Sequence, residues 1–260
     1  MLLVLDAGNT NTVLGIYQGD TLTHHFRVTT HRRGTSDEYG TLLSQLLERS
    51  GVDIGDVQGS ILASVVPQLN RALSQACRDY FHTEPIVVGP GIKTGMPILI
   101  DQPSEVGADR IVNAVAAWVK HGSALVVVDF GTATTFDAVS ERGEYLGGAI
   151  APGVDVSMDA LFQRTAKLPR VDVTRPANVI GKSTTDALRS GLFFGYVGLV
   201  DELTERIKNE LLQSGAKKVR VVATGGLAKS FADASRVIDA VDEYLTLEGL
   251  RVLYEMNQGK

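Results

Sequence analysis

The sequence predicts an α/β protein made of two similar halves, each with three strands, a helix, a strand and a helix. Two observations support this fold class. An apolar run broken by Asp, one residue, Gly and then Thr- or Asn-rich polarity occurs twice, beginning at Asp6 and Asp129, about half of the 260-residue chain apart. The same order of predicted elements surrounds each copy. We therefore expect an equivalent polar hairpin in each half, with a cleft between the halves.

The first half begins with three short strands, and the Gly-Asp turn of "YQGDTL" separates the second from the third. Apolar residues then recur at helical spacing. Pro67 stands where a first-turn proline would start the next helix. The predicted elements are strands 1–6, 12–17 and 21–28, a helix 36–50, a strand 59–66, a helix from Pro67 and a strand 84–89.

The second half repeats this order after a helix in "EVGADRIVNAVAAWV". The apolar face of that helix is expected to be core: Ile111, Val112, Val115, Ala116 and Val119. We expect one half to be formed by residues 1–117 and the other by residues 118–260, with no linker composition to mark the boundary between them. The predicted elements of the second half are strands 124–131, 134–140 and 143–153, helices 154–164 and 184–212, a strand 218–226 and a helix 245–257.

Composition and charge indicate an ordinary globular enzyme. The net charge of −5 gives no indication of a basic surface for nucleic acid or anionic membranes, so we expect neither as a partner. The N-terminus has no signal-peptide pattern and no segment is apolar enough to span a bilayer, so we expect a cytoplasmic protein. Cys77 is the only cysteine, which excludes an intramolecular disulfide, and its surroundings predict a buried helix face.

The repeated turns have the composition of phosphate-binding loops. Gly8 and Gly131 allow the backbone to approach a ligand closely, and successive N–H groups and the Asn and Thr side chains can bind an anion. A carboxylate beside phosphate suits a hydrated Mg²⁺ or a monovalent cation. A single Asp-x-Gly is more simply explained as a β-turn. Two copies at matched positions favour phosphate binding.

Three other stretches have competing interpretations. "GKSTT" is not a phosphate loop of the Walker type, because Pro176 stands where that motif needs Gly. Gly225 and Gly226 either pass close to a nucleoside or form an ordinary strand-to-helix turn. Asp109 is either a helix-start residue favoured by the dipole or a candidate base, with Arg110 as an anion-binding neighbour.

Five motifs together carry a resemblance to a known family. "DAGNTNT", "GADR", "DFGTATT", "GGAIAPG" and "TGG" occur in the order and spacing of the type III pantothenate kinases. The similarity extends over essentially the whole chain, and GADR is its most specific part. The resemblance implies the duplicated ribonuclease H-like fold of actin-like ATPases. It also implies ATP-dependent phosphorylation of pantothenate to 4′-phosphopantothenate, the first step of coenzyme A biosynthesis.

The resemblance also implies roles for individual residues. Asp109 would be the general base, Asp129 would help to bind K⁺ or NH₄⁺, and Asp6 would lie near the Mg²⁺ of ATP, through water. The ATP- and phosphate-binding residues would be Asp6, Ala7, Gly8, Asn9, Thr10, Asn11, Thr12, Val13, Thr132, Gly225 and Gly226. The substrate-binding residues would be Gly107, Ala108, Asp109, Arg110 and Thr184.

The resemblance implies a homodimer as well, which agrees with a 184–212 helix that is apolar on more than one face. One position departs from the family pattern, because Ile100 stands where many members have a tyrosine near the substrate. Two alternatives stay open: another kinase or a phosphatase of the same superfamily, and a non-catalytic regulatory relative. The presence of all three of Asp6, Asp109 and Asp129 argues against a regulator.

Overall fold

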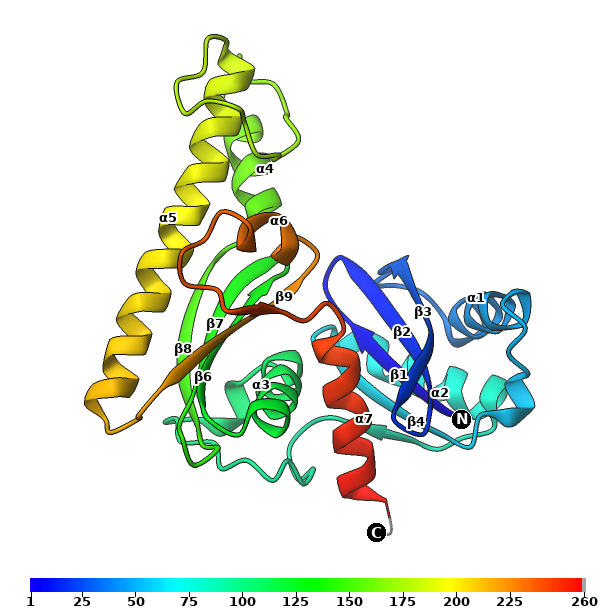
Figure 1. Cartoon of the computed structure of the whole chain (residues 1–260). Coiled ribbons are helices and arrows are strands. Elements are labelled where there is room, and N and C mark those ends of the chain that lie inside the picture. Colours follow the sequence, from blue (N-terminus) through cyan, green and yellow to red (C-terminus); the bar gives the residue numbers. More distant parts are fainter. Residues whose placement is uncertain (259–260) are drawn as a thin grey trace. The chain divides into compact units, whose positions relative to one another are not determined.

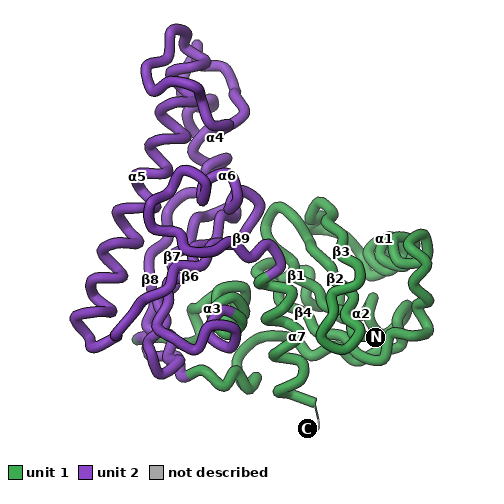
Figure 2. Tube along the Cα trace, in the orientation of Figure 1, with its two compact units in different colours: residues 1–96, 101–116, 245–260 green, residues 97–100, 117–244 purple. Residues whose placement is uncertain are grey.

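The computed structural model describes residues 1–258, which form two compact units (Figures 1 and 2). Unit 1 consists of residues 1–96, 101–116 and 245–260, and unit 2 of residues 97–100 and 117–244. Each unit contains a five-stranded sheet with helices. Within residues 1–258, no helix combines the length and the apolar character needed to cross a membrane.

The sheet of unit 1 has the strand order β3-β2-β1-β4-β5. The first three strands pair antiparallel, and β4 and β5 are parallel to β1. A helix precedes β4 and another precedes β5, as parallel pairing requires a crossover. The strands are β1 Leu2–Ala7, β2 Asn11–Gln18, β3 Thr21–Thr29, β4 Gly59–Ser64 and β5 Pro85–Val87, and the helices are α1 Ser36–Arg49, α2 Pro67–Phe81 and α7 Leu245–Asn257. The helix α3, Ala108–His121, belongs to unit 1 up to residue 116 and to unit 2 from residue 117.

The sheet of unit 2 has the same topology, in the order β8-β7-β6-β9-β10. Its first three strands are antiparallel, and β9 and β10 follow in parallel. The short segment 97–100 lies beside β8 through hydrogen bonds with Tyr145. The strands are β6 Ala124–Phe130, β7 Ala133–Val139, β8 Tyr145–Pro152, β9 Val219–Gly225 and β10 Ala240–Val241, and the helices are α4 Val154–Arg164, α5 Thr184–Gln213 and α6 Ala228–Ala232.

The strand register places equivalent residues at equivalent positions in the two sheets. Asp6 is the penultimate residue of β1 and Asp129 is the penultimate residue of β6. The last residue of each of these strands pairs with a threonine, Thr12 in β2 and Thr134 in β7, and both threonines are fully buried. The predicted repeat of three strands, helix, strand and helix is therefore confirmed, and the two Asp-x-Gly turns occupy equivalent positions.

Each sheet packs one face against helices through an apolar core. In unit 1, alternate residues of β1 (Leu3, Leu5 and Ala7) pack with the buried faces of α1 and α2. Cys77 lies in that core, as expected, and burial raises the pKa of its thiol to about 11. In unit 2, β6 packs against α5 and α6, where Phe193 and Phe231 stack with centroids 5.1 Å apart.

The apolar character of α5 is largely explained by the core of unit 2. Phe193 and Val200 are fully buried, and Phe194 and Val197 pack partly buried against the same cluster. The core of unit 2 therefore accounts for the apolar residues on more than one face of α5, and these residues do not by themselves require a partner subunit. Other apolar side chains are exposed on α4 and on the segment before α5; they are Val156, Phe162, Val179 and Ile180.

The last helix, α7, returns to the sheet of unit 1. Leu247 lies within contact of Gly15, opposite Val4 on β1, and Gly249 approaches the backbone of Val112 in α3 so closely that a Cβ atom would clash. The sequence-based division at 117/118 places this helix with the second half, whereas its contacts place it in unit 1. Small residues on both the strand and the helix permit this close packing.

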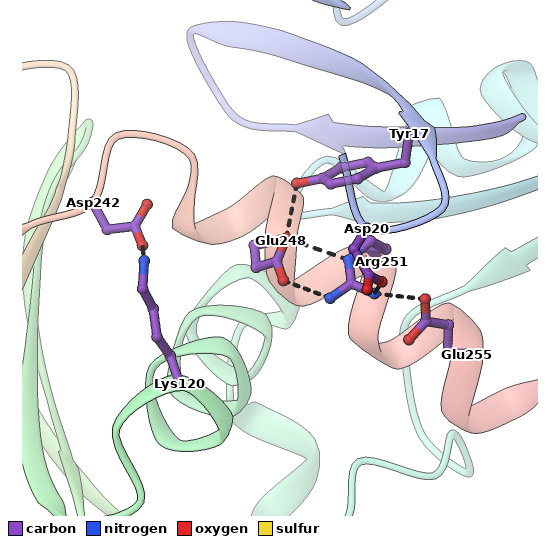
Figure 3. Close-up of polar contacts among 7 residues, drawn as sticks. All are labelled: Tyr17, Asp20, Lys120, Asp242, Glu248, Arg251 and Glu255. Carbon is purple, nitrogen blue, oxygen red and sulfur yellow. Dashed lines mark hydrogen bonds and ion pairs between the residues drawn. The ribbon is translucent and has the colours of Figure 1, made fainter. Parts of the chain in front are cut away.

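Arg251 fixes α7 to the β2–β3 turn (Figure 3). Its guanidinium donates to Glu248 at 2.6 Å and to Glu255 at 2.6 Å within the helix, and to Asp20 in the turn at 2.7 Å. Tyr17 donates to Glu248 at 3.2 Å and lies under the guanidinium, 5.8 Å from its ring centroid. Only 9% of Arg251 is exposed, so its ionic contacts are largely shielded from water on one side.

The structure differs from the sequence-based expectations in a few places. Val119 of α3 is 50% exposed, whereas the other four residues expected on its core face are buried. Val119 lies on the same stripe as Val112 and Val115, but in the last turn of α3, so periodicity alone does not decide its exposure. The elements α6 and β10, of five and two residues, were not expected from the sequence, because segments this short show no periodicity.

Candidate active site

The first hairpin joins β1 to β2 through a tight turn. The Gly8 N–H donates to the Asn11 carbonyl at 3.0 Å, and a Cβ atom at position 8 would lie 3.0 Å from that oxygen. Asp6 follows Val4 by two residues, so alternation directs its side chain to the face of the sheet opposite Leu5 and Ala7. The turn therefore brings exposed backbone and a carboxylate together at the end of the sheet.

Thr12 of the first hairpin contributes to the fold through its side chain. Its hydroxyl is fully buried and is 3.0 Å from the hydroxyl of Thr30, at the end of β3. The alternation that buries Leu14 and Ile16 on the same face explains this orientation. The backbone of Thr12, and not its side chain, is consequently the part that can contact a ligand.

The second hairpin joins β6 to β7 in the same way. The Gly131 N–H donates to the Ala133 carbonyl at 3.1 Å. Gly153, the last residue of "GGAIAPG", donates its N–H to the Thr132 carbonyl at 3.0 Å. A Cβ atom on Gly153 would clash with that carbonyl, so the motif needs glycine there in order to pack against the turn. Thr132 itself is exposed at the tip of the hairpin.

Asp129 lies directly beside the strand end that carries Gly225. Asp129 pairs with Thr224 across β6 and β9, and Phe130 pairs with Gly225. Gly225 has a φ of +92°, which other residues adopt only with strain. A Cβ atom at position 225 would lie 2.5 Å from the Asp129 Oδ1 atom, so glycine leaves this carboxylate uncovered on that side.

Asp109 occupies the first turn of α3. The Gly107 carbonyl accepts from the Ile111 N–H at 3.3 Å, and the Asp109 Oδ1 accepts from the Arg110 N–H at 2.8 Å. Burial raises the pKa of Asp109, a shift that the Arg110 N–H and the Arg110 charge oppose only in part. A carboxylate with a raised pKa is a stronger base than an ordinary aspartate.

Gly107 keeps one side of the Asp109 carboxylate open. A Cβ atom at position 107 would lie 2.6 Å from Oδ1. Any larger residue there would displace the carboxylate or cover it. The glycine of GADR thus has a specific geometric role beside the candidate base.

The remaining predicted residues lie in unit 2. Ser183 accepts a hydrogen bond from the Asp186 N–H and caps α5, which leaves Thr184 exposed in the first turn. No strand precedes "GKSTT", which agrees with the rejection of a Walker loop. Ile100 packs against Gly147, where a Cβ atom would lie 3.3 Å from its Cγ2 atom. Ile100, which stands where many family members have a tyrosine, therefore lies beside β8.

The candidate residues thus fall into two sets. Unit 1 holds the first hairpin (6–13) and the GADR segment (107–110), and unit 2 holds Asp129, Thr132, Thr184 and the turn at 225–226. Sequence reasoning missed one segment beside the first hairpin, Thr30–Gly34, which we call the basic loop. Its two consecutive arginines after a predicted strand were the available signal.

The fold is that of the actin-like ATPases and sugar kinases, a duplicated ribonuclease H-like fold. A protein from Sinorhizobium meliloti assigned as a 2-dehydro-3-deoxygalactonokinase matches 100% of this chain, and 98% of its own, at 12% identity with a TM-score of 0.55. The activator of 2-hydroxyisocaproyl-CoA dehydratase from Clostridium difficile matches 99% of this chain and 94% of its own at 12% identity, with a TM-score of 0.51. These likenesses define a class of fold.

The family is defined by much closer sequence relatives. A family model for type III pantothenate kinase matches residues 2–206. The type III pantothenate kinase of Pelobacter propionicus is 56% identical over 258 residues, covering 99% of this chain and 100% of the relative. That of Geotalea daltonii is 55% identical over 258 residues, covering 99% of each. The chain belongs to the type III pantothenate kinase family.

Proposed function

We propose that this protein transfers the terminal phosphoryl group of ATP to the terminal hydroxyl of pantothenate, the first step of coenzyme A biosynthesis, in the cytoplasm. The observation that carries the proposal is the 56% identity to a type III pantothenate kinase over 99% of the chain. The GADR segment and both Asp-x-Gly hairpins also lie at strand and helix ends, where backbone N–H groups are available.

The residues of the first hairpin fit the phosphates of ATP. Gly8 keeps the turn compact, so the exposed residues at its tip, Asn9 and Thr10, can present backbone N–H groups to an anion. Asp6, on the adjacent strand, suits a Mg²⁺ ion held through water rather than direct contact with phosphate. ATP with a divalent metal ion supplies the transferable phosphoryl group and partial neutralisation of its charge.

Thr132, in the second hairpin, and Gly225 and Gly226, after β9, fit the nucleotide side of unit 2. Thr132 is exposed at its turn, and the φ of +92° at Gly225 opens the strand end. We assign phosphate contact to Thr132 and the approach of the nucleoside to the two glycines.

Asp129 fits a monovalent cation, K⁺ or NH₄⁺. Its carboxylate is a hard oxygen donor, and Gly225 has no side chain to displace it. Among residues 1–258, no group of three or more His, Cys, Asp or Glu side chains is arranged to hold a metal ion. Hydroxyl and carbonyl oxygens would therefore have to complete the coordination, which suits a weakly hydrated monovalent cation.

Asp109 fits the general base. Its raised pKa strengthens it as a proton acceptor, and the Arg110 N–H fixes one of its oxygens. The remaining oxygen is then available to the pantothenate hydroxyl. Gly107, Ala108 and Arg110 would bind the substrate, with Arg110 contributing positive charge, and Thr184 of unit 2 is also assigned to substrate binding.

The protein is proposed to act as a homodimer. Support comes from apolar side chains exposed within unit 2, above all Ile180 at 83% and Val179 at 66%. Isolated exposed apolar residues are common, but side chains this exposed favour a partner surface. Light scattering at micromolar concentration should return twice the chain mass of 27.8 kDa. A mass of one chain would contradict the dimer.

The proposed reaction is tested by following ADP release with and without pantothenate. We expect turnover only with pantothenate, and mass spectrometry of the product should show one added phosphoryl group. Equal ATP turnover without pantothenate would contradict the substrate assignment. Turnover with a sugar or with acetate in place of pantothenate would indicate another kinase of the same fold.

A further inference from the structure

The basic loop, Thr30–Gly34, is attached to the first hairpin by the contact between the Thr12 and Thr30 hydroxyls and by three further hydrogen bonds. The Thr30 N–H donates to the Thr10 carbonyl at 2.9 Å, and the Thr30 hydroxyl donates to the Gly8 carbonyl at 2.8 Å. Arg32 donates from Nη2 to the Asn9 Oδ1 atom at 3.2 Å. These acceptors are three consecutive residues of the hairpin, so the loop and the hairpin tip form one structural element.

The basic loop is also held from its other side. The Gly34 N–H donates to the His31 carbonyl at 2.8 Å and closes a turn. The hydroxyl of Tyr39, a buried residue of α1, accepts from the His31 N–H at 3.0 Å. A Cβ atom at position 34 would lie 2.6 Å from the Tyr39 ring, so glycine is needed for this packing. The backbone that carries Arg32 is therefore held on both sides by contacts within the protein.

A cavity of about 380 Å³ lies at the basic loop. It is lined by Thr30, His31, Arg32, Arg33, Gly34 and Glu38. The lining thus contains two arginines and a single acidic residue, in a chain whose net charge is −5. The Glu38 carboxylate is the partner of the α1 N-cap and accepts from the Thr35 N–H at 2.8 Å and from the Thr35 hydroxyl at 3.1 Å. The cavity keeps an excess of positive charge.

Arg32 has further N–H groups that can donate hydrogen bonds to a ligand. A guanidinium has five N–H groups in a planar arrangement that matches phosphate oxygens. Within residues 1–258, the Arg32 side chain donates to Asn9 alone. Because Asn9 is at the hairpin tip, that one bond directs the guanidinium toward the element expected to hold nucleotide phosphate.

We propose that Arg32 is a phosphate-binding residue, which contacts the terminal phosphoryl group of the nucleotide held by the first hairpin. The proposal rests on the proposed function only in that the first hairpin binds a nucleoside triphosphate. The terminal phosphoryl group carries the greatest negative charge of the triphosphate, so a guanidinium stabilises it most. Arg32 thereby distinguishes a nucleoside triphosphate from the diphosphate product.

The test compares the binding of two nucleotides by calorimetry, with Mg²⁺ and without pantothenate. The ligands are ADP and a non-hydrolysable ATP analogue with an imido bridge, and the variants are Arg32→Ala, Arg32→Lys and Arg33→Ala. We expect Arg32→Ala to weaken the analogue about 10- to 100-fold, the usual worth of a charge-assisted hydrogen bond, and ADP much less. Arg32→Lys should recover part of the loss. Arg33→Ala removes the other positive charge that lines the cavity and should weaken binding of the analogue much less than Arg32→Ala does.

Three results would overturn the proposal. An equal loss for both nucleotides would show that Arg32 supports the hairpin in general. Unchanged affinity for the analogue would show that Arg32 makes no contact with the phosphoryl group. An equal effect of Arg33→Ala would show that only the charge of the loop matters. Since these measurements need no acceptor, a protein that binds nucleotides as expected and leaves pantothenate unphosphorylated refutes the proposed function alone.

Discussion

Gly225 lies so close to Asp129 that a Cβ atom at position 225 would be 2.5 Å from the carboxylate Oδ1 atom. The two residues come from neighbouring parallel strands, β9 and β6, whose ends coincide. The backbone of Gly225 also has a φ of +92°. Position 225 is therefore constrained both by its own conformation and by the carboxylate beside it.

Gly225→Ala is expected to impair the protein in two ways. The positive φ should cost about 1–2 kcal/mol of unfolding free energy, and the methyl group should displace Asp129. We expect the concentration of K⁺ needed for half-maximal activity to rise about tenfold or more, as the coordinating oxygen moves. Urea unfolding and K⁺ titrations of activity measure the two effects.

Gly215→Ala is the matched control for this substitution. Gly215 has a φ of +102°, and no atom lies within 4 Å of its Cβ position. The control carries only the cost of the positive φ, so it should lose less stability than Gly225→Ala, whose Cβ atom would also lie 2.7 Å from the Phe130 backbone, and it should keep the K⁺ response of the wild type. A shift of the K⁺ response in both variants would mean that stability alone explains the Gly225→Ala phenotype.

Asp129→Ala should remove the activation by monovalent cations. Without its carboxylate, the cation is lost and activity should fall about 10²-fold, with little remaining difference between K⁺ and a bulky organic cation. The measurement is the rate as a function of KCl at constant ionic strength. Asp172→Ala removes an exposed acid of the same unit and should leave the K⁺ response unchanged. Full K⁺ activation in Asp129→Ala would refute the assignment.

Asp109→Asn should reduce kcat by about 10²–10⁴-fold and leave nucleotide binding intact, because the amide keeps the shape and loses the base. In the wild type, the acidic limb of kcat/KM should lie above the ordinary aspartate pKa, since burial raises the pKa of Asp109. The limb should disappear in the variant. A change confined to KM would make Asp109 a hydrogen-bond acceptor for the substrate instead.

The stability of Asp109→Asn separates catalysis from folding. A carboxylate whose pKa is raised in the folded state binds its proton more tightly there than in the unfolded chain. The contribution of Asp109 to the free energy of unfolding therefore falls as the pH rises through the pKa that this carboxyl group has in the folded state. At neutral pH the variant should be at least as stable as the wild type in urea. A marked loss of stability would favour a structural role at the start of α3.

Arg251→Ala should weaken the attachment of α7. The arginine is 9% exposed and binds three carboxylates, but the side chains of Asp20 and Glu255 remain 86% and 52% exposed. We therefore expect a loss of about 2 kcal/mol, below the roughly 3–5 kcal/mol for a fully buried pair. Arg206→Ala breaks an exposed pair with Glu202 and should cost less than about 0.5 kcal/mol. Equal losses in urea unfolding would contradict the role of burial.

The sequence predicted most of the fold because its strands and helices have clear periods and strong turn residues. The position of Asp6 and Asp129 at the ends of equivalent strands followed directly from the repeat. The inward hydroxyls of Thr12 and Thr134 follow from strand alternation, once the register is known. The return of α7 to the first sheet could not be predicted in this way, because an apolar helix face does not specify which sheet it covers.

The site was predicted less completely for a related reason. Sequence motifs identified the candidate site residues. The raised pKa of Asp109, however, depends on burial by residues distant in sequence. The link between Arg32 and Asn9 spans 23 residues and depends on the β2–β3 register, which brings the end of β3 to the hairpin tip. Contacts of this kind leave no periodic signal.

The position of α7 has a consequence for synthesis on the ribosome. The 123 residues of 122–244 must be translated between α3 and α7, which takes roughly 6–25 s at about 5–20 residues per second. During that time the face of the first sheet around Val4 and Gly15 lacks the helix that covers it. The nascent chain therefore presents an apolar sheet surface while the second unit is still being made. This interval is when a chaperone would bind, and when neighbouring nascent chains on one messenger would be most prone to associate.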